Sequence, residues 1–137
     1  MTQRLPSVLL VDDDEDARFL IGSMLRRRGF EVDTVGSAAE CLAHLEASPS
    51  RVVVTDVQMP EMSGVDLCRQ IRERFPQVIA VVVSGAATKT VMADVAAAGA
   101  FSFLPKPVKI VDLERMILDA IGAHVAPSAA ARSSTAM

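Results

Sequence analysis

Residues 52–64 read VVVTDVQMPEMSG, and this stretch decides how the chain folds. The valines at 52–54 form a β-branched run without a polar interruption, which indicates a strand buried on both faces. The strand ends at Asp56, and a loop with Pro60 and Gly64 leads into a helical pattern. A buried strand followed by a loop and a helix is one unit of a parallel α/β sheet.

The same unit recurs on both sides of this stretch. Strands are predicted at residues 7–11, 30–34, 52–56, 79–83 and 101–104, and helices at about 14–28, 37–47, 65–74, 88–98 and 109–122. Five strands that alternate with five helices predict a parallel sheet covered on both faces. With right-handed crossovers, the flavodoxin-like doubly wound fold with strand order 2-1-3-4-5 is the expected topology. The period of the first helix directs five apolar residues inward: Ala17, Leu20, Ile21, Met24 and Leu25.

Length and composition predict one globular domain. The chain has 137 residues, of which 50% are hydrophobic and 23% are charged. We expect the domain to cover residues 1–124 and a disordered low-complexity tail of mainly Ala, Ser and Pro to cover 125–137. The start at Met1 and this tail favour a complete gene product, or a domain with its linker.

Other features of the composition bear on localisation and partners. Residues 1–4 lead directly into a strand without a signal peptide, and the apolar runs are too short to span a bilayer. Cys41 and Cys68 lie in separate helical patterns, which suits a reducing compartment, so we expect a cytoplasmic protein. The net charge of -3 and the absence of Trp and Tyr argue against direct binding of nucleic acid. The arginines at 26–28 are explained as cations at a helix C-terminus before Gly29.

Polar side chains follow every predicted strand except the second. Asp12 and Asp13 follow the first strand, Asp56 ends the third, Ser84 follows the fourth, and Lys106 follows the fifth. The carboxyl ends of parallel strands meet at one edge, and ligands of such sheets bind there, at the switch point between the first and third strands. We therefore expect these five side chains to share one site.

The residue types suggest phosphoryl chemistry at that site. Three crowded carboxylates repel each other and require a cation at neutral pH. Oxygen ligands favour a hard ion, with Mg²⁺ as the first choice and Mn²⁺ as a substitute. The charge of Lys106 and the hydroxyl of Ser84 would then help to hold a phosphoryl group on one aspartate.

Each residue taken alone has a simpler explanation. The acids at 12–14 suit a helix N-terminus, which is sufficient for Asp14. Asp56 alone suits a turn cap, Ser84 an ordinary loop serine, and Lys106 a solvated surface charge. Only their joint arrangement favours a site. The neighbouring acids are interpreted as solvated or capping residues: Glu15, Asp16, Glu61 and Asp66.

Four motifs in this order and spacing resemble the response-regulator receiver domains of two-component signalling. They are VLLVDDDEDAR at 8–18, VVVTDVQMPEMSG at 52–64, VVVSG at 81–85 and GAFSFLPKP at 99–107. The resemblance covers roughly residues 7–122. The set is highly specific, although any single fragment would carry no information.

The resemblance implies a role for each matching position. Asp56 is expected to be the phospho-acceptor, and Asp13 a direct Mg²⁺ ligand, with Asp12 acting directly or through water. The backbone carbonyl of Gln58 is expected to complete the metal site. Lys106 would be the charge partner of the phosphoryl group, and the Lys106–Pro107 bond is expected to be cis.

The resemblance also implies a switch. Ser84 is the expected switching hydroxyl and Phe103 the aromatic residue that turns inward when Ser84 moves, although Phe103 also suits an ordinary core position. Gly85 departs from the alanine that is frequent in the family. Tyr is also widely used at the position of Phe103, and because Phe has no hydroxyl, its readout must be steric.

We expect a signalling switch that catalyses only its own phosphotransfer and autodephosphorylation. A sensor histidine kinase or a histidine phosphotransfer protein would phosphorylate Asp56, and this would rearrange the fourth helix, fifth strand and fifth helix, at about 88–121. That surface would bind a downstream protein, an output domain outside this chain, or a second copy of the chain. A relay role, a fragment of a hybrid kinase, a metal-dependent phosphatase or nuclease, and an unphosphorylated interaction module remain alternatives.

Overall fold

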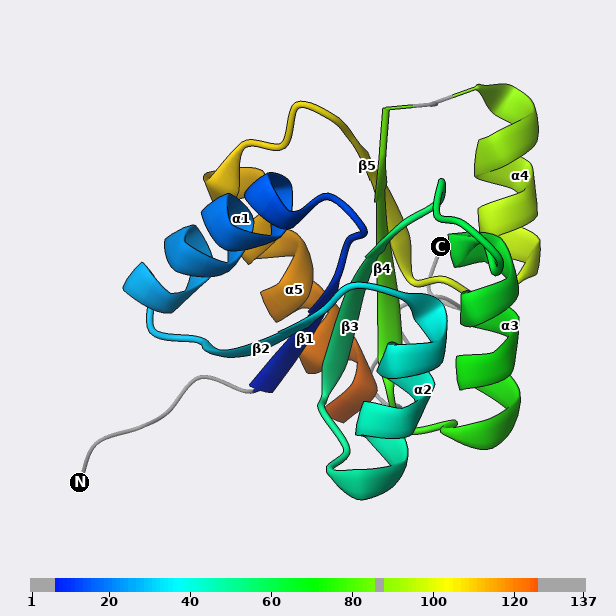
Figure 1. The fold of residues 1–137 in the computed structure, drawn as a ribbon, viewed down its shortest axis with the longest axis horizontal. Coiled ribbons are helices and arrows are strands. Elements are labelled where there is room, and N and C mark those ends of the chain that lie inside the picture. The colour runs from blue at the N-terminus through cyan, green and yellow to red at the C-terminus, as the bar shows by residue number, and fades with distance from the viewer. Residues whose placement is uncertain (1–6, 86–87, 126–137) are drawn as a thin grey trace, which may run out of the picture.

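The computed structural model describes residues 7–85 and 88–125, in which five strands alternate with five helices (Figure 1). The strands are β1 (Ser7–Val11), β2 (Glu31–Val35), β3 (Val52–Asp56), β4 (Ile79–Ser84) and β5 (Ser102–Pro105). The helices are α1 (Glu15–Arg27), α2 (Ala38–Ala47), α3 (Gly64–Arg74), α4 (Lys89–Ala97) and α5 (Ile110–Val125). The strands pair in parallel in the order β2-β1-β3-β4-β5, which confirms the predicted fold.

The observed element ends differ slightly from the prediction, and the later start of the second strand has a clear cause. The second strand begins at Glu31 because Phe30 takes part in the turn that follows α1, where its N–H donates to the Leu25 carbonyl at 3.3 Å. Gly29 adopts a φ of 98°, which permits this reversal of the chain. The last helix continues to Val125, past its predicted end at 122, and residues 126–137 of the predicted tail lie outside the described residues.

The sheet is covered on both faces, which explains the uninterrupted apolar strands. Helices α1 and α5 cover one face, and α2, α3 and α4 cover the other (Figure 1). Alternate residues of each central strand serve the two layers: Val8 and Leu10 pack toward α1 and α5, whereas Leu9 and Val11 pack toward α2 and α3. The strands therefore hold a core on each side and leave their carboxyl ends for polar residues.

The predicted inward face of α1 was wrong at Leu20. Its side chain is 59% exposed, and that of the neighbouring Phe19 is 73% exposed. The helix instead packs onto the sheet through Gly22 and Leu25, both buried, with Ile21 partly buried beside them. Successive residues are about 100° apart around a helix, so this centre of contact turns Leu20 away from the sheet.

No helix within the described residues is long and apolar enough to cross a bilayer.

A close approach of backbone to backbone joins α3 to the end of β3. The Gly64 N–H donates to the Val57 carbonyl at 2.8 Å, and a Cβ at this glycine would collide with the carbonyl oxygen of Asp56. Neither neighbour is a flexible side-chain end that could move aside. Gly64 therefore sets the distance between α3 and the loop that carries Asp56.

We predict that Gly64→Ala lowers the free energy of unfolding by about 1–3 kcal/mol, because overpacking forces the backbone to shift. Chemical denaturation followed by circular dichroism measures the change. Gly122→Ala is the matched control: a Cβ at Gly122 meets nothing within 4 Å, and Ala is the better helix former. Wild-type stability in the Gly64 variant would show that the close approach is not needed.

Candidate functional site

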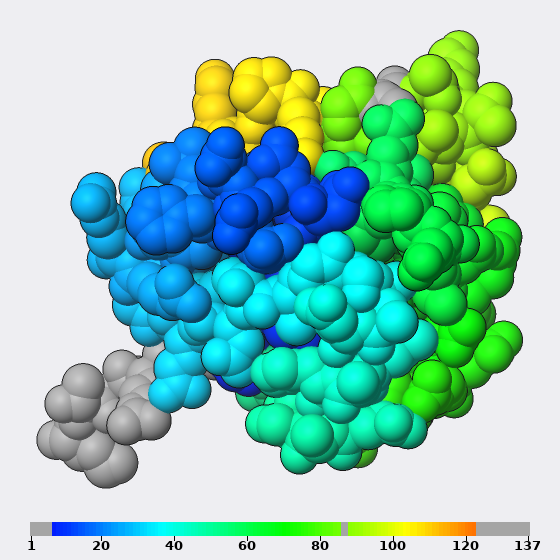
Figure 2. Space-filling model, in the orientation of Figure 1, coloured from blue at the N-terminus to red at the C-terminus, as the bar shows by residue number. Residues whose placement is uncertain are grey.

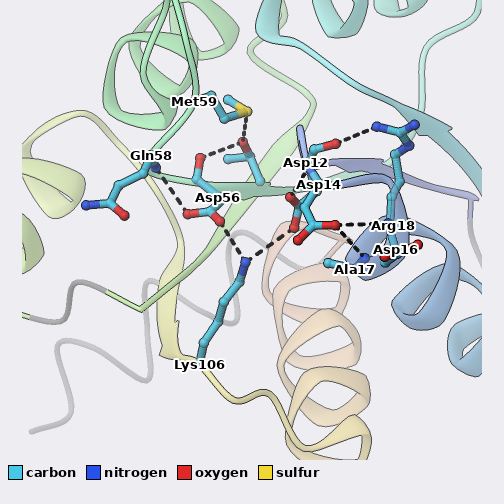
Figure 3. A network of polar contacts seen from close by, with 10 residues as sticks. Asp12, Asp14, Asp16, Ala17, Arg18, Asp56, Gln58, Met59 and Lys106 are labelled. Carbon is cyan, nitrogen blue, oxygen red and sulfur yellow. Dashed lines mark hydrogen bonds and ion pairs between the residues drawn. The ribbon is translucent and has the colours of Figure 1, made fainter.

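Three of the five side chains that were expected to share one site, those of Asp12, Asp56 and Lys106, meet at the carboxyl edge of the sheet. The strands align there, because Val11 pairs with Thr55 and Ser84 pairs with Pro105. Asp12 and Lys106 directly follow β1 and β5, and Asp56 ends β3, so that these three side chains point toward one another (Figure 3). The parallel topology thus brings together groups that are up to 94 positions apart in the sequence.

Lys106 bridges two poorly exposed carboxylates. Its Nζ lies 2.7 Å from Oδ2 of Asp56 and 3.3 Å from Oδ2 of Asp12. The Asp12 side chain is 4% exposed and that of Asp56 is 12% exposed. Charges removed from water to this extent require opposite charge and hydrogen bonds nearby. The ammonium of Lys106 supplies both.

The same contacts act on the pKa of Lys106. Burial by itself lowers this pKa, whereas the hydrogen bond to Asp56 and the negative charges of Asp12 and Asp56 raise it, with a net result above the ordinary lysine value. Lys106 is therefore cationic throughout the neutral range. The stability that its ion pairs contribute is fully present below the ordinary lysine pKa and is lost as the pH rises through the raised value.

Asp12 is held by contacts to both its backbone and its carboxylate. Its N–H donates to the Val35 carbonyl at 3.2 Å, and its Oδ1 accepts from the Asp14 N–H at 2.9 Å. Its own carbonyl accepts from Nη1 of Arg18 at 2.7 Å (Figure 3). Asp14 itself is the N-cap of α1, as its simpler explanation predicted.

Asp56 combines the turn-capping geometry with the charge pairing. Its Oδ1 accepts from the Gln58 N–H at 3.1 Å, and its Oδ2 faces Lys106. The fully buried Thr55 donates its hydroxyl to the Asp56 carbonyl at 3.0 Å and approaches the Met59 sulfur. The side chain of Gln58 points away from this cluster (Figure 3). Metal ligation by the Gln58 carbonyl stays a prediction.

The two predicted switch residues are Ser84 and Phe103. Ser84 is fully buried at the end of β4, and its carbonyl accepts the Lys106 N–H at 2.9 Å. Phe103 is partly buried and packs against the apolar cluster beneath α3 and α4. The Lys106–Pro107 peptide bond is cis. Positions 86 and 87 of the loop after Gly85 lie outside the described residues.

The donor set suits a hydrated Mg²⁺ ion better than a cage of protein ligands. Asp13 is exposed, and among residues 7–85 and 88–125 no three acidic, histidine or cysteine side chains are grouped to hold a metal ion. Mg²⁺ commonly binds through one or two carboxylates and keeps several waters, so such a group is not required. Asp12 and Asp56 provide two carboxylates at one edge, which fits that mode.

Two residues of this site were not predicted from the sequence. Arg18 contacts the backbone carbonyl of Asp12, and Thr55 contacts the backbone carbonyl of Asp56. Because both contacts are to the backbone, no motif of ligand-type side chains points to either residue. A signal was present for Arg18, because a cation in the first turn of a helix opposes the helix dipole. No comparable signal marked Thr55, since β-branched residues are ordinary in strands.

One hollow on the surface lies beside the cluster, and another lies far from it. A mostly apolar groove of about 220 Å³ runs between α1 and the loop after β5, lined by Leu20, Met24 and Lys106 among others. Figure 2 shows this loop, in yellow, against α1, in blue. A larger hollow, about 430 Å³, lies at the opposite edge between α3 and α4, lined in part by Arg72 and Phe101. None of the predicted site residues lines it. The candidate site is therefore assigned from the polar cluster and not from the size of a hollow.

Comparisons with known proteins identify the family. The sequence pattern of the response regulator receiver domain matches residues 8–118. The chain is 31% identical over 123 residues to the DNA-binding transcriptional regulator NtrC of Azospirillum brasilense, which covers 90% of this chain and 26% of that protein. It is 37% identical over 109 residues to the sensor kinase CckA of Brucella abortus, covering 78% of this chain and 12% of the kinase.

A solved structure agrees. The CheY-like response regulator receiver domain protein of Methanospirillum hungatei matches with a TM-score of 0.83 at 28% identity, over 88% of this chain and 96% of that one. This chain therefore spans about a quarter or less of the two relatives named above but nearly the whole of a solved receiver domain. The chain belongs to the response regulator receiver domains of two-component signalling systems.

Proposed function

We propose that this receiver accepts a phosphoryl group on Asp56 from the phosphohistidine of a partner, either a sensor histidine kinase or a histidine phosphotransfer protein. The observation that carries the proposal is the pairing of Asp56 with Lys106 at 2.7 Å, at the edge of the sheet where Asp12 also lies. A carboxylate held between a backbone N–H and an ammonium is fixed in position and still 12% exposed. These are properties required of a nucleophile.

The transfer needs positioning and charge compensation more than covalent help. An oxygen of Asp56 bonds to phosphorus as the bond from phosphorus to the partner's imidazole nitrogen breaks, which gives an acyl phosphate and a free histidine. Lys106 offsets the negative charge beside Asp56. Bound Mg²⁺, or Mn²⁺, would supply further positive charge to the phosphoryl oxygens. Asp12 and Asp56 would hold it with water, and Asp13 and the Gln58 carbonyl are the other proposed ligands.

The backbone offers a route from Asp56 to the far side of the sheet. Because the Lys106 N–H is bonded to the Ser84 carbonyl, a movement of Lys106 toward a phosphoryl group acts directly on the end of β4. Phe103 lies three residues before Lys106 and packs under α4. We propose that the Ser84 hydroxyl moves to the phosphoryl group and Phe103 moves inward, which shifts an existing equilibrium between two states.

The output surface is proposed to be α4, β5 and α5. Apolar side chains are exposed on α4, before β5 and on α5: Met92, Phe101, Val111 and Leu118. Val111 and Leu118 are seven residues apart and thus share one face of α5. The occupant is a downstream protein, an output domain of a longer protein, or a second copy of this chain. Sedimentation with and without beryllofluoride tests the last of these.

We predict that incubation with Mg²⁺ and acetyl phosphate adds one phosphoryl group to the wild type, measured as intact mass. Asp56→Ala should show none, because the accepting oxygen is gone. Asp66→Ala, which removes an exposed aspartate of α3, should behave as the wild type. A wild type that never gains the group, even with beryllofluoride as a mimic, would favour the unphosphorylated interaction module. Sustained hydrolysis of external phosphoesters would instead favour a phosphatase.

We predict that Lys106→Ala lowers the free energy of unfolding at pH 7 by about 1–3 kcal/mol, because two poorly exposed carboxylates lose their shared partner. Added Mg²⁺ should stabilise this variant more than it stabilises the wild type, since the ion replaces the missing charge. Thermal unfolding at several Mg²⁺ concentrations provides the comparison. Lys109→Ala, at an exposed lysine, is the control. Equal Mg²⁺ effects in all three proteins would contradict the proposed role of the cluster.

A further inference from the structure

We propose that Arg18 is a positioning residue for the metal-binding acids, and that Gly36 exists to make room for it. The proposal rests on the proposed Mg²⁺-dependent function and assigns two residues that the phosphorylation chemistry does not use. Arg18 would fix the peptide that joins Asp12 to Asp13, so that both carboxylates leave the chain in the directions that the metal requires.

The contact that carries the proposal is a hydrogen bond to a backbone carbonyl. Arg18 is the fourth residue of α1, and its Nη1 donates to the Asp12 carbonyl at 2.7 Å. That carbonyl belongs to the peptide between Asp12 and Asp13. The orientation of this peptide sets the direction in which the side chain of Asp13 leaves the backbone. Asp13 is exposed, so its direction depends on the backbone that precedes it.

The other polar groups of Asp12 have different partners, so Arg18 acts on Asp12 through this carbonyl. The Asp12 N–H is bonded to the Val35 carbonyl, its Oδ1 to the Asp14 N–H, and its Oδ2 to Lys106. Arg18 thus completes a set of contacts on a residue that is 3% exposed. Ligand-orienting contacts of this kind usually matter for metal affinity almost as much as the ligands themselves.

The position of Arg18 is not explained by the dipole of its own helix. It follows the acids Glu15 and Asp16 in the first turn of α1, and the positive end of the helix dipole disfavours a cation there. Its contact with the Asp12 carbonyl supplies a reason that the helix does not.

Gly36 provides an independent observation. Its φ is not in the left-handed region, so the backbone itself does not require a glycine. A Cβ there would lie 2.9 Å from Nη1 of Arg18 and 3.7 Å from its Cζ, with Oε1 of Glu40 next at 3.9 Å. The guanidinium therefore occupies the space that a side chain at this position would need. Because the crowded atom is the end of a flexible side chain, Gly36→Ala should displace Arg18 without unfolding the protein.

A charge role and a positioning role of Arg18 predict changes of opposite sign in cation affinity when Arg18 is removed. If Arg18 acted only through its charge, its removal would strengthen cation binding, since one repelling charge near the site disappears. If Arg18 fixes the Asp12–Asp13 peptide, its removal weakens cation binding despite that gain. The direction of the change in affinity therefore distinguishes the two roles.

The test measures Mn²⁺ affinity directly, from the loss of the electron paramagnetic resonance signal of free Mn²⁺, so it does not depend on phosphorylation. Arg18→Ala should weaken binding on the order of tenfold. Arg27→Ala, at an exposed arginine at the far end of α1, should leave it unchanged. Unchanged or tighter binding in Arg18→Ala, with a wild-type circular dichroism spectrum, would overturn the proposal.

Gly36→Ala tests the same contact with the charge retained. It should weaken Mn²⁺ binding in the wild-type background but add nothing in the Arg18→Ala background, because the displaced group is then absent. Additive effects would overturn the role given to Gly36. A wild type that binds Mn²⁺ but takes up no phosphoryl group would defeat the proposed function alone. Normal phosphorylation together with wild-type affinity in both variants would defeat this inference alone.

Discussion

The ammonium of Lys106 between the carboxylates of Asp12 and Asp56 is the interaction on which the rest of this structure depends. Asp12 and Asp56 are 4% and 12% exposed at the end of adjacent parallel strands, and their mutual repulsion would oppose closure of the sheet edge. Lys106 follows β5, the outermost strand next to β4, and compensates both charges at once. The fold therefore brings two poorly exposed carboxylates together at an edge of the sheet where Lys106 can neutralise them.

Much of the surrounding structure keeps these three side chains in place. Gly64 lets α3 approach the carbonyl of Asp56, and the Gln58 N–H holds one of its carboxylate oxygens. The Val35 carbonyl and Arg18 hold the backbone of Asp12 from β2 and α1. In each of these contacts at least one partner is a backbone group. The contacts therefore fix the directions of the Asp12 and Asp56 side chains without adding ligands to the site. The proposed transfer of a phosphoryl group to Asp56 would benefit from such rigid surroundings.

The sequence predicted the sheet, its strand order and the meeting of Asp12, Asp56 and Lys106, because buried parallel strands have continuous apolar runs and deliver their ends to one edge. It failed where tertiary packing decides. Leu20 follows the helical period but faces outward, since α1 meets the sheet through Gly22 and Leu25. The contact of Arg18 with a carbonyl, and the space left by Gly36, depend on backbone positions that no side-chain pattern encodes.

The bridging position of Lys106 also bears on the proposed switch, in which one group added to Asp56 would alter a whole face of the domain. A phosphoryl group on Asp56 offers Lys106 more negative charge than a carboxylate does, so Lys106 must redistribute its contacts between Asp56 and Asp12. The backbone of Lys106 is tied to β4, because its N–H is bonded to the Ser84 carbonyl, and Phe103 lies three residues earlier in the chain and packs under α4. In the proposed switch, the electrostatics at Asp56 would be linked through these contacts to the packing on the α4 side of the sheet.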